Sequence, residues 1–281
     1  MRRATDIALK LRRSRGFTLV EMIISIVIAG IILGLVGLFG KGQITAYLDA
    51  GNRAELADAA DTAVRRVARD LQSALPNSVR QSGNVIEFVP IRDAGRYRAE
   101  QTSTGTGNPL DFSNAADNSF DVLGPPVTVT AGDQLVIYNL GQPPDSDVYA
   151  GSSRRAITTA AGATNSLSFN IGAGQFPFAS PQRRFQIVGT PVAYECAANA
   201  ADPSLGVVRR YGGYGFQGAV PSGFVSLGAT SSLLVTDVAA CSFSYLPAVL
   251  HRNGLVVLRL TLTRNGESVE ILHQVEVLNT P

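Results

Sequence analysis

The segment Arg15-Gly16-Phe17-Thr18-Leu19-Val20-Glu21 opens a long apolar run. From Phe17 to Gly40 the only residues that are neither apolar nor glycine are Thr18, Glu21 and Ser25. A helix needs about 20 predominantly apolar residues to cross the hydrocarbon core of a bilayer. The run therefore predicts a transmembrane helix over residues 17–40.

Glu21 is a carboxylate one helical turn inside this run. A charge at mid-bilayer costs about 2.5–3.5 kcal/mol on insertion scales, so such a residue calls for a partner. In one interpretation Glu21 lies near the cytoplasmic face and reaches water, and the segment is an ordinary anchor. In the other, the chain is cut after Gly16 and Glu21 becomes the fifth residue of a helix that packs against related helices.

The basic leader, Gly16, Phe17 and the following Thr-Leu-Val-Glu resemble the class III leader of type IV prepilins and type II secretion pseudopilins. The resemblance implies that a prepilin peptidase cuts after Gly16 and methylates the new N-terminus at Phe17. It also implies that Glu21 neutralises the Phe17 amine of a neighbouring subunit. Such a pair is strong in a low dielectric, and leaving either member unpaired there is costly. A Sec-type signal peptide fits less well, because no small-residue cleavage site follows a short apolar core.

The formal net charge of +2 depends on the leader. Residues 1–16 hold six basic side chains and one acidic side chain, so the mature chain keeps 18 basic and 21 acidic side chains, a net charge of −3. A basic leader keeps the N-terminus cytoplasmic. The mature chain gives no net-charge argument for a nucleic-acid partner.

Residues 41–75 are expected to continue the helix in amphipathic form. Apolar residues recur at three- and four-residue steps and form one stripe; they are Leu56, Ala60, Ala63, Val64, Val67, Leu71, Ala74 and Leu75. Asp61 and Arg65 have the favourable i,i+4 order, and Pro76 stops the helix. Within the membrane half, Gly30 and Gly34 have the spacing of close helix contacts, or are simply tolerated there.

Residues 76–281 predict a β-rich head. Short β-type runs separated by turn residues are expected to be strands, at residues 84–90, 134–140, 167–170, 184–188, 191–196, 206–210, 241–245, 255–263 and 268–278. Residues 100–121 and 141–150 are expected to be loops. Asn265-Gly266 between two β-rich runs predicts a hairpin. Antiparallel strands over an amphipathic helix give an α+β fold, which is also the type IV pilin-like fold that the resemblance implies.

The head has two cysteines, Cys196 and Cys241. With the leader inside the cell, the head is expected in the oxidising periplasm or outside the cell, where a disulfide is the natural interpretation. Two separately buried thiols are the alternative. No CxxC or HxxxH spacing indicates a metal site.

The sequence shows no catalytic motif, and we expect neither an enzyme nor a cofactor. His251 and His273, the two histidines, are interpreted as surface or sheet residues. Asp145 and Asp147 could contribute to a calcium site, but a solvated loop is the simpler interpretation. Arginine pairs could bind DNA phosphate or partner carboxylates, but we expect surface solvation or subunit contacts; they are Arg65-Arg66, Arg154-Arg155, Arg183-Arg184 and Arg209-Arg210.

Further segments resemble minor pilin-like subunits of mannose-sensitive haemagglutinin (MSHA) type IV pili; they are residues 57–63, 65–71, 74–79, 95–98, the two cysteines, 254–256 and 279–281. The implied partners are other minor and major pilins, the prepilin peptidase and the inner-membrane assembly platform. The subunit would sit in the inner membrane before assembly and on the pilus afterwards. A type II secretion pseudopilin, a tip-presented adhesin or DNA-uptake subunit, and a plain membrane-anchored domain are the alternatives.

Overall fold

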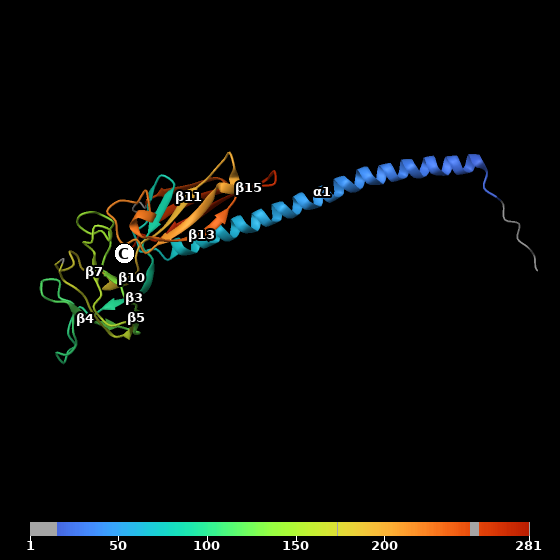
Figure 1. The fold of residues 1–281 in the computed structure, drawn as a ribbon. Helices are drawn as coiled ribbons and strands as arrows, with labels where there is room; N and C mark the ends of the chain where they lie inside the picture. Colours follow the sequence, from blue (N-terminus) through green and yellow to red (C-terminus); the bar gives the residue numbers. More distant parts are fainter. Residues whose placement is uncertain (1–15, 173, 248–252, 281) are drawn as a thin grey trace, which may run out of the picture. The chain divides into compact units, whose positions relative to one another are not determined.

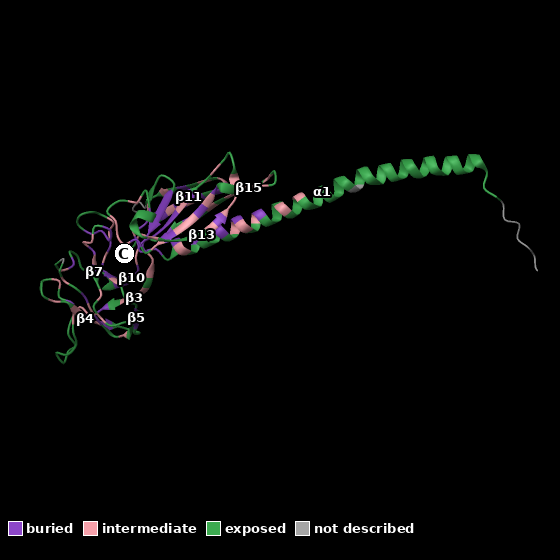
Figure 2. Cartoon of the chain, viewed as in Figure 1, coloured by how far each residue is buried: buried purple, intermediate pink, exposed green. Residues whose placement is uncertain are grey.

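The computed structural model describes residues 16–172, 174–247 and 253–280. The chain divides into two compact units, one ending at Gly51 and the other beginning at Asn52. Helix α1 (Leu19–Gln72) runs from the first unit into the second (Figure 1). In the first unit every described side chain from Phe17 to Leu48 is exposed (Figure 2). By length and composition α1 can cross a membrane, in line with the prediction for residues 17–40.

Helix α1 ends at Gln72, three residues before the predicted end at Leu75. The backbone N–H of Leu75 donates to the carbonyl of Val89 at 2.7 Å, and that of Ile91 donates to the carbonyl of Ser73 at 2.9 Å. An isolated antiparallel bridge between Ala74 and Pro90 thus replaces the last helical turn. Pro76, which lacks a backbone N–H, follows directly.

Two antiparallel sheets of the second unit contribute buried residues to the same core as α1. The first has the order β1 (Arg80–Ser82), β2 (Val85–Phe88), β11 (Val192–Ala197), β12 (Val207–Gly212), β13 (Thr230–Thr236). The second has the order β14 (Val238–Leu246), β15 (Gly254–Arg264), β16 (Glu267–Val277). Short 3-10 helices lie at Pro203–Leu205 and Val225–Leu227.

The predicted stripe of α1 is the centre of this core. Leu56, Ala60, Ala63, Val64, Val67 and Leu71 are all at most 1% exposed. They share one cluster with Phe88, Tyr194 and Leu260 from the two sheets. Burying a large aliphatic side chain stabilises a fold by about 1.5–3 kcal/mol, so this stripe is what holds α1 to the sheets.

Residues 91–188 form two further sheets with a core of their own. The larger has the order β7 (Arg154–Ala156), β6 (Gln134–Val136), β10 (Arg184–Val188), β3 (Ile91–Tyr97), β4 (Ser119–Leu123), β9 (Ser166–Ser168). The smaller pairs β5 (Val127–Val129) with β8 (Gly162–Thr164). Their core is aromatic: the Phe120 ring packs on Phe185 at 5.3 Å and on Phe169 at 6.3 Å between centroids.

The strand predictions are right where the apolar pattern is strong. Residues 184–188 form β10 with the predicted bounds, and the Asn265-Gly266 turn joins β15 to β16 with Arg264 opposite Glu267. The α+β prediction is confirmed, and every strand pair in the described part of the chain is antiparallel.

Two predictions are wrong in detail. The predicted loop 100–121 ends in β4, which begins at Ser119 and pairs with β3 and β9. The predicted strand 134–140 stops at Val136, and two residues later Tyr138 has a φ of +52°, which lies outside the extended region. The loop predicted at residues 141–150 contains no strand.

A disulfide joins Cys196 of β11 to Cys241 of β14, with 6.0 Å between their Cα atoms. It therefore links the two sheets that share a core with α1. The two cysteines are 45 residues apart in the sequence.

We expect the double variant Cys196→Ser/Cys241→Ser to unfold more easily than the wild type. Cross-linking a loop of this length contributes roughly 3–4 kcal/mol through the entropy of the unfolded chain. Denaturant unfolding of oxidised protein measures the difference, and the same variant under reducing conditions is the control. Equal unfolding midpoints for wild type and variant in oxidising buffer would contradict the expectation.

Candidate assembly site

Thr18 caps the start of α1. Its Oγ1 accepts a hydrogen bond from the backbone N–H of Glu21 at 3.2 Å, as a threonine at an N-cap does. Thr18 and Glu21 have the spacing of a capping box. Within the described part of the chain, the Glu21 carboxylate makes no hydrogen bond or ion pair. The cap thus fixes the first turn while the carboxylate remains open to a partner.

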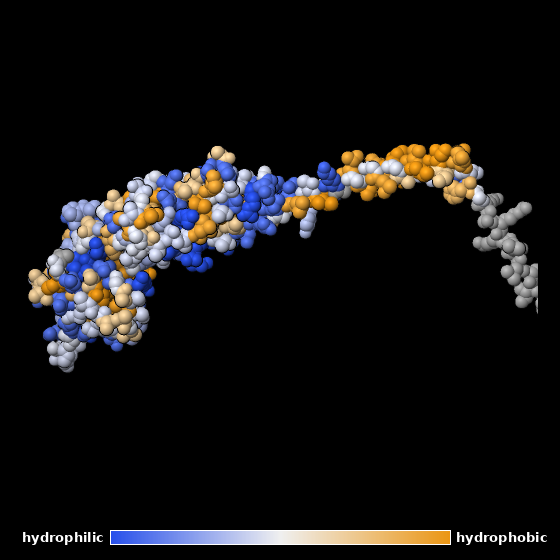
Figure 3. All heavy atoms as spheres, viewed as in Figure 1, coloured by the Kyte–Doolittle hydropathy of each residue, from blue (hydrophilic) through white to orange (hydrophobic). Residues whose placement is uncertain are grey.

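The surface of residues 17–39 is almost entirely apolar (Figure 3). Side chains at every angle around the helix are exposed, among them Leu19, Ile23, Ile28 and Leu33. A helix that is apolar all round is normally buried in a membrane or in other helices. An added Cβ at Gly30 or Gly34 would meet no described atom within 4 Å, so nothing in this chain requires glycine there.

Asp70 fastens the last turns of α1 to the sheet beneath it. Its Oδ2 accepts a hydrogen bond from the Tyr194 hydroxyl at 2.7 Å and from Arg210 Nε at 3.0 Å. Arg66 Nε lies 3.5 Å from Oδ1 of the same carboxylate. Burial, and then the hydrogen bond to Asp70, raise the pKa of Tyr194, so this phenol remains a donor. Arg210 on β12 thus binds α1 through Asp70.

Most side chains of the four arginine pairs form hydrogen bonds or ion pairs within the chain. Arg155 is buried and donates to several backbone carbonyls, and Arg154 donates to the carbonyl of Val148 at 2.8 Å. Arg183 pairs with Glu100 at 3.0 Å. Arg65 pairs with Asp61 at 2.7 Å, the i,i+4 pair expected from the sequence. The structure therefore does not bring the four pairs together into one basic patch.

The other predicted positions have ordinary surroundings. Asp147 is buried and its carboxylate accepts the N–H of Ala150 at 2.7 Å, while Asp145 is exposed. His273 is partly exposed on β16; His251 lies outside the described residues. Among the described residues, no group of three or more His, Cys, Asp or Glu could hold a metal ion.

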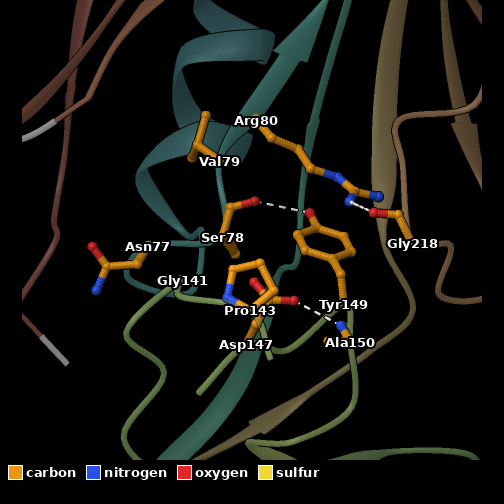
Figure 4. A pocket seen from close by; sticks show the side chains of 10 residues that line it. All are labelled: Asn77, Ser78, Val79, Arg80, Gly141, Pro143, Asp147, Tyr149, Ala150 and Gly218. Carbon is orange, nitrogen blue, oxygen red and sulfur yellow. Dashed lines mark hydrogen bonds between the residues drawn. The ribbon is translucent and has the colours of Figure 1, made fainter. Parts of the chain in front are cut away.

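A pocket of about 260 Å³ lies between residues 77–80, 141–150 and Gly218 (Figure 4). The Tyr149 hydroxyl donates to the carbonyl of Ser78 at 2.8 Å, and the Arg80 guanidinium lies 3.5 Å from the centre of the Tyr149 ring. Arg80 also pairs with the fully buried Glu87. Burial raises the pKa of the Glu87 carboxyl and of the Tyr149 phenol. Tyr149, Arg80 and Glu87 bind one another and the backbone of Ser78, so the polar side chains beside this pocket stabilise the fold.

Sequence reasoning missed Thr18, Asp70 and Glu87. The Thr18-x-x-Glu21 spacing is a capping-box signal that could have identified the first. Asp70 has no such signal, because its partners Tyr194 and Arg210 are more than 120 residues away in the chain. Glu87 occupies the buried strand β2 within an otherwise apolar run.

The fold and the start of α1 together define a class: an α+β protein whose helix begins at a leader junction and presents an apolar surface with one carboxylate, Glu21, on it. The family model described as prokaryotic N-terminal methylation motif matches residues 11–37. The chain therefore carries the class III leader of type IV pilins and pseudopilins. This leader implies processing by a prepilin peptidase and assembly with other pilins. No curated protein and no solved structure is significantly similar to the chain.

We expect Asp70→Ala to destabilise the second unit by roughly 2–4 kcal/mol, since it leaves the buried Tyr194 hydroxyl and the part-buried Arg210 without their acceptor. Asp61→Ala on the same helix is the matched control. It removes only the exposed pair with Arg65, and exposed ion pairs contribute little to stability. Urea unfolding followed by tyrosine fluorescence compares the two. A loss for Asp70→Ala no larger than that for Asp61→Ala would show that Asp70 does not fasten the helix.

Proposed function

We propose that this protein is a minor pilin-like subunit of an MSHA-type type IV pilus, acting in pilus biogenesis as part of the priming or tip complex. The observation that carries the proposal is the methylation motif over residues 11–37, which runs directly into an exposed apolar helix. A subunit of this class inserts in the inner membrane, loses its leader and packs its helix with those of other subunits.

In this proposal the peptidase cuts after Gly16 and methylates Phe17. The new amine and the Glu21 carboxylate are both unpaired charges in apolar surroundings. Leaving either the amine or the carboxylate unpaired in apolar surroundings is energetically unfavourable. The Glu21 carboxylate of one subunit pairs with the Phe17 amine of its neighbour, and this contact sets the axial register of the helices.

The head supports a role at the tip or at initiation. It adds the sheets of residues 91–188 to the sheets that pack on α1, and repeated shaft subunits have to pack closely. The finer likeness is to MshO, the MSHA minor pilin-like protein, and rests on the segments of sequence that resemble it. The head is proposed to be periplasmic before assembly, to act without catalysis, and to contact other minor pilins.

A type II secretion pseudopilin is the second candidate. The same leader motif serves both classes, so the residues 11–37 support it equally. The two differ in the partners of the subunit. Crosslinking in the native membrane followed by mass spectrometry distinguishes pilus subunits from components of a secretion system.

We expect Glu21→Ala to be processed normally but to enter filaments at least about tenfold less often. The substitution leaves a neighbour's ammonium unpaired, and breaking a buried pair in this way costs about 3–5 kcal/mol. Electrophoretic mobility reports processing, and quantification of the subunit in sheared filaments reports incorporation.

Ser25→Ala is the matched control, one turn further along α1. The Ser25 hydroxyl donates to the backbone carbonyl of Glu21, so its removal leaves the carboxylate in place. We expect Ser25→Ala to enter filaments as the wild type does. Normal incorporation of Glu21→Ala would rule out the register role of Glu21.

A further inference from the structure

Two strands of the second unit form open edges of their sheets. β13 is the last strand of the five-stranded sheet, and β16 is the last strand of the three-stranded sheet. No backbone hydrogen bond joins the outer edge of either strand to another described residue. An open edge presents unpaired N–H and C=O groups that another strand can join.

The β13 edge lacks most of the features that protect such edges. Thr230–Thr236 contains no charged residue and no proline, and Leu233 is 52% exposed. A bulge near Leu234 interrupts the pairing with β12, so Thr230–Leu233 is the regular half of the strand. An unprotected edge of this kind is a template for pairing with another chain.

A basic groove runs beside this half of β13. It has a volume of about 440 Å³ and is lined by Leu233 and Leu234 from the strand and by four residues of α1: Thr62, Arg65, Arg66 and Arg69. Arg65 is 71% exposed although it pairs with Asp61. Arg69 makes no ion pair with any described residue. The groove therefore combines an apolar floor with a cationic wall, while Asp58 lies further along, beside Val235 and Thr236.

The β16 edge has the opposite charge. Glu270 and Glu276 are exposed on the outward face of the strand, and neither has an ion-pair partner in the described chain. Leu272 lies between them and is 48% exposed. The remaining acid of the strand, Glu267, is already paired with Arg53 at 2.7 Å.

We propose that the β16 edge of one copy of this chain adds to the β13 edge of a second copy. Glu270 then faces the wall of Arg65 and Arg69, and Leu272 meets Leu233. Pairing of two like edges would oppose like charges, which is destabilising. Only unlike edges fit, so the contact between the two copies is heterologous and directional. It is a contact between heads, beyond the helix packing of the proposed function and independent of it.

Photocrosslinking of the full-length protein in detergent micelles tests this contact. A photoreactive benzoylphenylalanine replaces Leu272, and mass spectrometry identifies the peptide to which it crosslinks. We expect crosslinks between copies to residues 230–236. Absence of that crosslink at micromolar concentrations of protein would overturn the proposal.

Charge reversal makes the test specific. We expect Arg65→Glu/Arg69→Glu and Glu270→Arg each to reduce the crosslink at least about tenfold, and an equimolar mixture of the two variants to restore it. Arg184→Glu, which reverses an exposed charge on β10, is the control and should leave the crosslink unchanged. Recovery in the mixture also shows that both variants fold. Reversal without effect, or a mixture that does not recover, would overturn the proposal.

Discussion

An apolar helix surface with one carboxylate on it cannot stay in water, and this constraint determines the organisation of the chain. The described side chains from Phe17 to Leu48 are exposed on α1. At about 25 cal/mol for each Å² of apolar surface, so many exposed side chains strongly favour lipid or other helices over water. The second half of the same helix buries its apolar side chains within the chain, because Leu56, Val64 and Leu71 pack in one core with the sheets. One helix therefore needs an external partner at one end and supplies the internal core at the other.

The sequence predicted the parts of the fold in which hydrophobic period and turn chemistry agree. The stripe from Leu56 to Leu71 and the hairpin at Asn265-Gly266 are of this kind. In the second sheet system, strands were predicted where β6, β9 and β10 lie, but β3, β4, β5, β7 and β8 were missed because they are short or polar. β3 reads Ile-Arg-Asp-Ala-Gly-Arg-Tyr, and its pairing with β10 rather than its pattern makes it a strand. Gly95 belongs to that pairing: a Cβ there would lie 2.7 Å from the Phe185 ring.

In the candidate site, too, residues close together in sequence could be predicted and contacts between residues far apart in sequence could not. The leader junction, Phe17 and Glu21 are local in sequence and could be read from it, as the match to the methylation motif over residues 11–37 shows for the leader. The contacts that fasten α1 could not be read. Asp70 and Tyr194 are 124 residues apart, and Arg53 and Glu267 are 214 residues apart. Isolated charges look like surface residues until the fold brings their partners to them. For the same reason, the arginine pairs were expected to be solvated or to contact other subunits, whereas several of them bind partners within the chain.

The central claim is that cleavage after Gly16 frees an amine that a neighbour's Glu21 neutralises. Intact-mass and peptide mass spectrometry of the protein isolated from its native membrane tests this claim most directly. We expect a polypeptide that begins at Phe17 and carries one methyl group on its N-terminal nitrogen. A mature polypeptide that retains residues 1–16 would contradict the account and leave only a membrane-tethered domain.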